Sequence, residues 1–513
     1  MKKTSILLLT CLVANLTLAQ TKNIDNVNDT FKVKNSGAIL NKDSDVDGYY
    51  FFYELDKLKK GDREFAIQIL DKNLNEIAQK NYIDNKNTFL MKSSFNNQQV
   101  MFAMANYKEK KITLLSFDTK ANQLPKVEFP LESKEIRYLQ YMQQSGDFNV
   151  LFPIENKGFI FNKFEDNKNI GYSLKYYPTN GDTAWEYSSP KDSKDYLAIN
   201  PIEANDKYLV ALESSKSSLL SRKITLKTKV IDIKTGDLLF EKEYAKNKKP
   251  KLITNVFFDN KNNLILMGEY FKEGDNIYTD KSLGLAMELI DSTGKTIREE
   301  FISWKDDVVK LANIKGDYLD EKGYVFFHKI VKTNQNEFYA VGEFYKKTVS
   351  GGGVALSALS MLGGGGPTNV TQLTITNSVV FKFNSDFKLT EIKEYEKGKS
   401  RAPSLTDFGS PQLNAFALKG QGAFDYEYTQ VDKVNDRFYS CFIDYERLKG
   451  EKNKNAFKTI IYDEGKLSED KIYLQNDAVE FRVLPAKLGN VLLLEYDKKL
   501  KKLNLHLEKM NIN

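Results

Sequence analysis

One pattern of this chain reads Ile67-Gln-Ile-Leu-Asp71-Lys-Asn-Leu-Asn-Glu-Ile77, an alternating apolar run, a turn opened by Asp, and a second alternating run. Alternation of apolar and polar residues predicts β-strands, and an Asp or Asn side chain can accept hydrogen bonds from the turn backbone that follows it. The stretch therefore predicts a β-hairpin. The same pattern recurs at residues 114–124, 230–239, 288–297, 380–389 and 461–467.

The spacing of these hairpins predicts a repeat architecture. They recur roughly every 50 to 60 residues, about the size of a four-stranded propeller blade, and a single hairpin cannot bury its own apolar face. A less regular hairpin spans 172–187, and a C-terminal pair at 490–496 and 502–509 lacks an outer strand. We expect an all-β propeller of seven or eight four-stranded blades, with eight favoured. Two consecutive β-sandwich or partial-propeller domains are the alternative.

The missing outer strand is expected from the N-terminus, near 30–34, so that the first and last strands pair and close the ring. Such closure hides edge strands that would otherwise be open to aggregation. Aromatic residues make up 12% of the chain and there are only 11 prolines, which also favours sheet over helix.

The first residues have the features of a secretory signal peptide: Lys2 and Lys3, an apolar stretch, and a small residue at Ala19. We predict cleavage after Ala19 and a single propeller domain over 20–513, placed in the periplasm or outside the cell. The apolar stretch is shorter than the ~20 residues that a membrane anchor needs. A lipid anchor at Cys11 is a third, weaker interpretation.

The composition of the exported chain limits its possible disulfides and its class of partner. Removing Lys2 and Lys3 leaves 73 basic residues against 69 acidic ones, about +4, and the only remaining cysteine is Cys441. No intramolecular disulfide can form, so stability must come from buried apolar area. Cys441 lies in a strand-like run and is expected in the core. The lysine clusters are interspersed with acids, as in solvated turns, and nothing indicates a nucleic-acid partner.

One stretch departs from the repeat. Glycine clusters at 351–353 and 363–366 bracket an apolar segment at 354–362 whose leucines, Leu356, Leu359 and Leu362, have helical spacing. We expect a flexible insertion within a blade at about 350–376. Its leucines are expected to pack on the propeller surface or over the channel. A lid, or a peripheral docking segment for a membrane or partner protein, is the alternative, and the segment is too short to span a bilayer.

An Asp-rich loop is the sharpest candidate for a metal site. Asp43, Asp45 and Asp47, followed by Gly48 and Glu54, fit a calcium-loop pattern in which alternate carboxylates converge on one cation. The flanking sequence predicts strand rather than the helices of an EF-hand, and a strand would carry Glu54 about 17 Å away. An ordinary acidic turn is the favoured interpretation. A structural calcium ion held by Asp43, Asp45 and Asp47 is the alternative.

The sequence offers little support for a zinc site, a nucleophilic triad or a pair of catalytic carboxylates. His328 and His506 are the only histidines, which excludes a multi-His zinc site within one chain, and neither lies beside a nucleophile-elbow sequence. Each is expected to be a strand residue. Asp425 and Glu427 would lie on one face of a strand about 7 Å apart, within the range of glycosidase carboxylates, but any half-exposed strand shows this alternation.

The hairpin repeat behind a signal peptide resembles uncharacterised exported β-propeller-like proteins of bacteria. The resemblance rests on turn chemistry and carries no functional residue to this chain. We expect a binding or scaffold protein, rather than an enzyme, whose loops contact an unknown protein or glycan, with no cofactor apart from the calcium alternative. The rival is a glycan hydrolase or lyase with acids and tyrosines at the channel mouth, recognised by perturbed carboxylates at one rim. A calcium-dependent adhesin is a third alternative.

Overall fold

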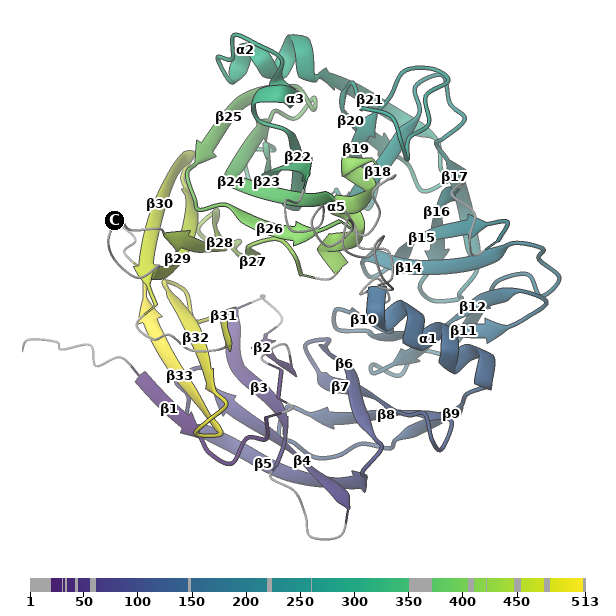
Figure 1. Cartoon of the computed structure of the whole chain (residues 1–513), viewed down its shortest axis with the longest axis vertical. Coiled ribbons are helices and arrows are strands. Elements are labelled where there is room, and N and C mark those ends of the chain that lie inside the picture. Colours follow the sequence, from purple (N-terminus) through teal and green to yellow (C-terminus); the bar gives the residue numbers. More distant parts are fainter. Residues whose placement is uncertain are drawn as a thin grey trace, which may run out of the picture.

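A computed structural model of the chain describes residues 20–510 apart from 30, 33–34, 42–44, 56–60, 146–148, 219–223, 260, 350–370, 405–409, 421, 447–453 and 475–479. The described strands form eight antiparallel sheets. Figure 1 shows these sheets arranged as blades in a ring, each with its first strand toward the centre. The chain is therefore an eight-bladed β-propeller, which confirms the predicted fold and the favoured of its two expected blade counts.

The blades follow one another along the chain. Blades 1 to 4 comprise β2 (Ser36–Leu40), β3 (Val46–Glu54), β4 (Asp62–Asp71), β5 (Glu76–Asn85); β6 (Phe89–Phe95), β7 (Gln99–Asn106), β8 (Lys111–Asp118), β9 (Val127–Pro130); β10 (Leu151–Ile154), β11 (Gly158–Asp166), β12 (Ile170–Pro178), β13 (Glu186–Ser188); and β14 (Tyr196–Ala204), β15 (Tyr208–Lys216), β16 (Thr225–Asp232), β17 (Leu238–Glu243).

Blades 5 to 8 comprise β18 (Lys251–Phe258), β19 (Leu264–Tyr270), β20 (Gly284–Ile290), β21 (Thr296–Ser303); β22 (Tyr324–Lys332), β23 (Phe338–Val349), β24 (Thr371–Phe383), β25 (Leu389–Tyr395), with β26 (Ser400–Pro403) beside β24; β27 (Tyr426–Asp432), β28 (Arg437–Glu446), β29 (Lys454–Asp463), β30 (Lys466–Tyr473); and β31 (Glu480–Pro485), β32 (Asn490–Asp497), β33 (Lys502–Lys509), β1 (Gln20–Ile24).

The repeated hairpin is the third and fourth strand of a blade, in blades 1, 2, 4, 5, 6 and 7. Its turn chemistry is confirmed at Asp71, whose Oδ1 accepts from the backbone N–H groups of Asn73 and Asn75, both at 2.8 Å. Equivalent bonds form at Asp118, Asp232, Asp291 and Asn384. In blade 7 the turn uses Glu464 and Gly465 with positive φ, and Asp463 accepts from Arg437 Nε at 2.6 Å instead.

The N-terminus closes the ring, but with a different segment from the one expected. β1 pairs antiparallel with β33, from Gln20 opposite Leu507 to Ile24 opposite Leu503, and Figure 1 shows purple β1 beside yellow β33. The prediction of 30–34 is wrong because Phe31 is needed elsewhere: its ring packs edge-on against Tyr496, with centroids 5.3 Å apart, and is fully buried. Thr30, Val33 and Lys34 lie outside the described residues.

The strand order gives the ring two unlike faces. Because adjacent strands are antiparallel, first-to-second and third-to-fourth connections emerge on one face, and second-to-third connections and inter-blade links on the other. We call them the turn face and the elaborated face. The helices of the described residues all lie in inter-blade links on the elaborated face: α1 (Ser133–Ser145), η2 (Trp304–Val308), α2 (Val309–Leu311), α3 (Tyr318–Glu321) and α5 (Pro411–Gly420).

The core lies between blades, where the inner strands pack face to face. Phe52 of blade 1 stacks on Phe102 of blade 2 with ring centroids 4.1 Å apart. Polar side chains also reach across: the donor–acceptor pairs are Asn162 Nδ2 to Ile199 O, Asn255 Nδ2 to Phe327 O, Gln430 Nε2 to Ala486 O and Arg482 Nη1 to Ser36 O, at 2.5–3.0 Å. These bonds satisfy backbone carbonyls that face a neighbouring blade and fix the angle between blades.

The Gly-rich stretch joins two strands of blade 6, as expected for an insertion within a blade. β23 and β24 pair out to Val349 opposite Thr371, so the expected boundary of 376 is wrong: 371–376 belong to β24. The apolar segment 354–362 lies outside the described residues. In the part of the chain that the structure describes, no helix combines the length and apolarity needed to cross a bilayer.

Candidate functional site

The Asp-rich loop is only partly described. Asp45 precedes β3, and its N–H donates to Asn41 Oδ1 at 3.0 Å; Asp47 is exposed at a β-bulge opposite β2. Glu54 lies at the other end of β3, buried, with a carboxylate oxygen 3.5 Å from Arg63. Asp43 is outside the described residues, and the described ones contain no cluster of three metal-ligating side chains. The calcium site at Asp43, Asp45 and Asp47 stays a prediction.

The two histidines and Cys441 take the expected strand positions, whereas Asp425 and Glu427 do not share one regular strand face. His506 is on β33 and His328 on β22. Cys441 is buried on β28, and burial raises the pKa of its thiol to about 12, which keeps it unreactive. Asp425 comes just before β27, while Glu427 sits at a β-bulge between residues paired with Phe442 and Cys441. The bulge breaks the simple alternation from which a paired-carboxylate face is inferred.

A charged network joins blades 6 and 7 beneath the link 396–425. At its centre, Glu343 of β23 has no exposed side-chain surface; His328 Nε2 donates to its Oε2 at 2.9 Å. Lys397 Nζ lies 3.0 Å from the other Glu343 oxygen and also contacts Asp425 Oδ2 at 2.5 Å. Lys419 of α5 donates to His328 Nδ1 at 2.9 Å. Five ionisable side chains from three elements and one link therefore form one continuous chain.

Aromatic rings pack around the network, and two further hydrogen-bond donors contact its carboxylates. The His328 ring stacks on Tyr426, with centroids 4.6 Å apart and planes 8° apart, and Phe424 packs against its edge. The backbone N–H of Tyr426 donates to Glu343 Oε2 at 3.1 Å, and Ser400 Oγ donates to Asp425 Oδ2 at 2.7 Å. Apolar walls lower the local dielectric, so each ion pair is strong and each unpaired charge costly.

Burial and neighbouring charges set the protonation states. Burial and the Lys419 ammonium lower the pKa of His328 to about 3, so the ring is neutral, donating from Nε2 and accepting at Nδ1. Burial lowers the pKa of Lys419 to about 8 and raises that of Asp425 to about 6. Burial would also raise the pKa of Glu343, but Lys397 and His328 hold it well below its usual range. At neutral pH two carboxylates and two ammonium groups balance.

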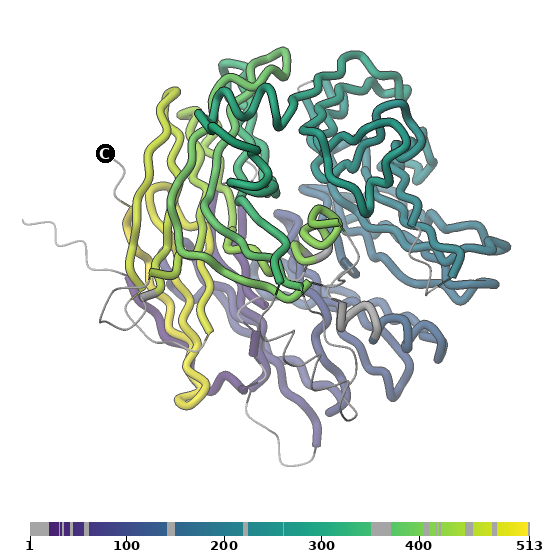
Figure 2. The backbone as a smooth tube through the Cα atoms, turned by 45° about the horizontal axis from the view of Figure 1, so that its top comes forward, coloured from purple at the N-terminus to yellow at the C-terminus, as the bar shows by residue number. Residues whose placement is uncertain are grey.

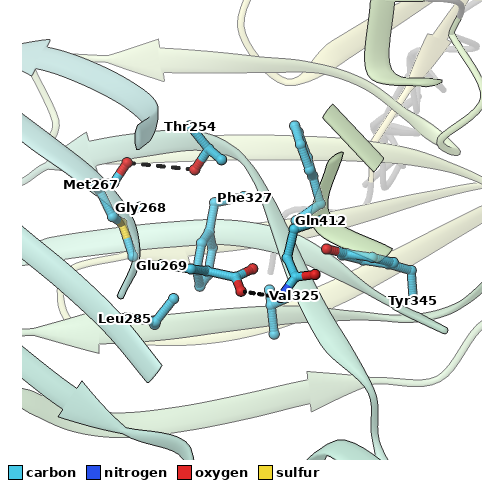
Figure 3. Close-up of a pocket in the computed structure, with 10 residues that line it drawn as sticks. Thr254, Met267, Gly268, Glu269, Leu285, Val325, Phe327, Tyr345 and Gln412 are labelled. Carbon is cyan, nitrogen blue, oxygen red and sulfur yellow. Dashed lines mark hydrogen bonds between the residues drawn. The ribbon is translucent and has the colours of Figure 1, made fainter. Parts of the chain in front are cut away.

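Helix α5 also contacts blade 5. Gln412 Nε2 donates to Glu269 Oε2 of β19 at 3.0 Å, and Figure 3 shows these two side chains facing each other across a small cavity. The cavity, also lined by Thr254 and Tyr345, measures about 10 Å³, room for a single water molecule and no larger ligand. Burial raises the pKa of Glu269 to about 7, and hydrogen bonds from Ser282 and Gln412 only partly offset it.

Glu269 and Glu343 belong to a repeat of buried glutamates that the sequence-based predictions do not include. In blades 4, 5, 6 and 8 the sixth residue of the second strand is a buried glutamate: Glu213, Glu269, Glu343 and Glu495. The signal is present in the chain, because each of the apolar runs at 208–212, 264–268, 338–342 and 491–494 ends on this glutamate. A carboxylate that directly follows an apolar strand run is a sign of a paired, buried charge.

In blades 5 and 6 a glycine precedes the glutamate. A Cβ at Gly268 would lie 2.1 Å from Leu252 O, and one at Gly342 would lie 2.4 Å from Phe326 O. The inner strand bulges at both places and comes close to the second strand. Only glycine allows this approach, which brings Glu269 and Glu343 under α5 and its link.

We expect Glu269→Gln to remove part of the pH dependence of stability. Because the folded pKa of Glu269 is raised to about 7, its contribution is fully present below the unfolded pKa and is lost as pH rises through 7. The loss amounts to about 3 kcal/mol at alkaline pH. Raising the pH from 5 to 8 should therefore cost the variant about 3 kcal/mol less free energy of unfolding than it costs the natural chain.

The exposed Glu391→Gln is the control, and it should keep the natural pH dependence. Asp425, His328 and Lys419 also have shifted pKa values, but they are present in the natural chain and in both variants, so their contributions cancel in the comparison. A Glu269→Gln chain with an unchanged difference between pH 5 and pH 8 would show that Glu269 is ionised in the fold throughout.

Comparisons with known proteins place the whole chain in one family. A family model described as a family of unknown function, DUF6770, matches residues 1–511. The chain belongs to this family. No curated protein matches the sequence.

Similar solved structures include propellers from unrelated proteins. The WD40 domain of SCAP from fission yeast is 9% identical, with 88% of this chain and 93% of that one covered and a TM-score of 0.37. Prolyl oligopeptidase B from Galerina marginata (9% identity, 93% and 56% covered, TM-score 0.40) and oligopeptidase B from Leishmania major (9%, 85% and 54%, 0.33) follow. The chain spans about half the length of these oligopeptidases. With TM-scores below 0.5, the eight-bladed assignment rests on the strand pairing of this chain.

Proposed function

We propose that this protein is an exported binding or scaffold propeller that holds a protein or glycan partner on its elaborated face. The observation that carries the proposal is the asymmetry of the two faces. Long links, including 304–323 and 396–425 with their helices, gather on one face, whereas the other has short turns. In both Figure 1 and Figure 2 helix α5 lies within the ring on this side of blades 5 and 6. Recognition residues concentrate on such loops over a rigid scaffold.

Exposed apolar side chains occur on both faces, Val434 of the turn face included, and on the elaborated face they include four on neighbouring blades. Leu283 is 46% exposed in a link of blade 5, Leu311 40% on α2, Val349 67% at the end of β23 and Tyr445 39% near the end of β28. All four lie on consecutive blades, 5 to 7. Apolar side chains on the loops of a rigid body are the anchors that protein partners and sugar rings use.

The proposed export fits the ring closure. Cleavage after Ala19 would leave Gln20 as the first residue, so every described residue of β1, Gln20–Ile24, would be retained. The strand that closes the ring would then survive processing intact. A structural calcium ion at Asp43, Asp45 and Asp47 is part of the same proposal.

Site-specific photocrosslinking in the cell that makes the protein tests the binding face. A benzophenone amino acid at Leu311, Val349 or Tyr445 should give a discrete adduct of the same partner. The control is Leu488, 39% exposed on a turn-face connection, which should give none. Adducts from Leu488 alone, or none from any position, would overturn the proposed face.

Catalysis on glycans is the second candidate, and one observation favours it. Asp425 ends the link 396–425 on the elaborated face, Glu269 lies beneath helix α5 of the same link, and their pKa values rise to about 6 and about 7. Carboxyl groups with raised pKa values are a common feature of active sites, although burial also raises the pKa of Glu203, which lies toward the turn face. Both side chains are less than 7% exposed, so the link would have to open before a substrate reached them.

A further inference from the structure

A second, independent feature lies on the opposite face, at the tips of blades 6 and 7. Here the first turns of both blades and the third-to-fourth turn of blade 7 surround a concave pocket of about 520 Å³. Its walls include Asn334 and Gln335 from blade 6, with Val434, Asp436, Arg437 and Glu464 from blade 7. The pocket is open to solvent, so a small molecule held there would stay partly exposed, whereas the cavity beneath α5 has room for one water molecule only.

The turns that form the pocket are held in place before any ligand binds. The backbone N–H of Asn334 donates to Asp436 Oδ1 at 2.9 Å, which ties the two blades together. Asp432 accepts from the backbone of Val434 and Asn435, both at 3.1 Å, and fixes the blade 7 turn. The Arg437 side chain is anchored on Asp463. Such preorganisation reduces the entropy lost on binding.

The chemistry of the walls indicates the class of ligand. Asn334, Gln335 and Arg437 supply N–H donors, while the Asp436 and Glu464 carboxylates supply acceptors. A metal ion or an organic cation requires mainly acceptors, and a phosphate or carboxylate requires mainly donors. A hydroxyl group both donates and accepts, so a ligand with several hydroxyls uses both kinds of wall.

We propose that this turn-face pocket binds a neutral saccharide. Val434, 87% exposed, is the one apolar residue of the pocket and gives a C–H face of the sugar ring a place to pack. The amide, guanidinium and carboxylate groups of the walls would then exchange hydrogen bonds with the ring hydroxyls. The site is separate from the elaborated face, so a partner there and a sugar here can be bound together.

Calorimetric titration of the chain from Gln20 with neutral sugars tests the proposal. The probes are glucose, galactose, mannose, N-acetylglucosamine and their β-linked disaccharides at millimolar concentration. At least one should bind saturably. Gln335→Ala combined with Glu464→Gln should weaken that binding by about tenfold or more, because a hydrogen bond to a charged group is lost. Both side chains are exposed, so the fold should be retained, as unfolding midpoints can verify.

The charge-matched control is Asp237→Asn, at an exposed turn of blade 4, which should leave sugar affinity unchanged. Absence of saturable binding by every probe overturns the proposal, and so does binding that the double variant retains. None of these substitutions touches the photocrosslinking positions, so failure here leaves the proposed binding face untouched, and the reverse also holds.

Discussion

Replacing Lys397 by methionine should lower the free energy of unfolding by about 3–5 kcal/mol, the loss expected when one partner of a buried ion pair is removed. Lys397 contacts both Glu343 and Asp425, and its side chain has no exposed surface. Methionine fills a similar volume, so the loss reports an uncompensated buried charge rather than a void. Denaturant unfolding at neutral pH measures it.

Lys399→Met is the matched control, two residues along the same link and exposed. It should change the unfolding free energy by less than about 0.5 kcal/mol. The loss in Lys397→Met should also shrink toward pH 5, because Asp425, whose pKa is raised to about 6, becomes neutral there. Equal losses in the two variants would mean that the network adds nothing specific to the fold.

A chain that begins at Asp25 should be destabilised by more than about 5 kcal/mol. It loses Ile24, a buried residue worth about 2–5 kcal/mol, and a ladder whose hydrogen bonds contribute about 1 kcal/mol each. It also exposes the edge of β33, with its buried Leu503, Leu505 and Leu507. We expect a broad, low unfolding transition and self-association, measured by calorimetry and light scattering.

The reference is a chain that begins at Gln20, which should unfold like a chain carrying all 513 residues. Ile24→Ala in that chain isolates the buried side chain and should lose only part of the effect. Unchanged unfolding of the chain from Asp25 would show that β1 is dispensable and that ring closure comes from the inter-blade contacts alone.

The sequence alone determined the hairpins of the blades, because the residues that specify each strand and turn lie close together in the chain. Alternation decides which side chains of a strand face the neighbouring blade, and Asp71 or Asp291 closes its turn with backbone groups two to four residues away. Such signals need no knowledge of distant residues. The hairpins, a propeller of seven or eight blades and the need for an N-terminal closing strand could therefore be predicted.

Only the tertiary structure decided which segments meet. β1 rather than 30–34 pairs with β33 because Phe31 fills a gap beside Tyr496, nearly the whole chain length away. Glu343, Lys397 and Lys419 become one network because α5 and its link fold back over blade 6, and burial then resets their proton affinities. These outcomes depend on the packing of residues that are distant in sequence. The local strand pattern is the same in every blade, so it cannot specify which distant segment each strand or link contacts.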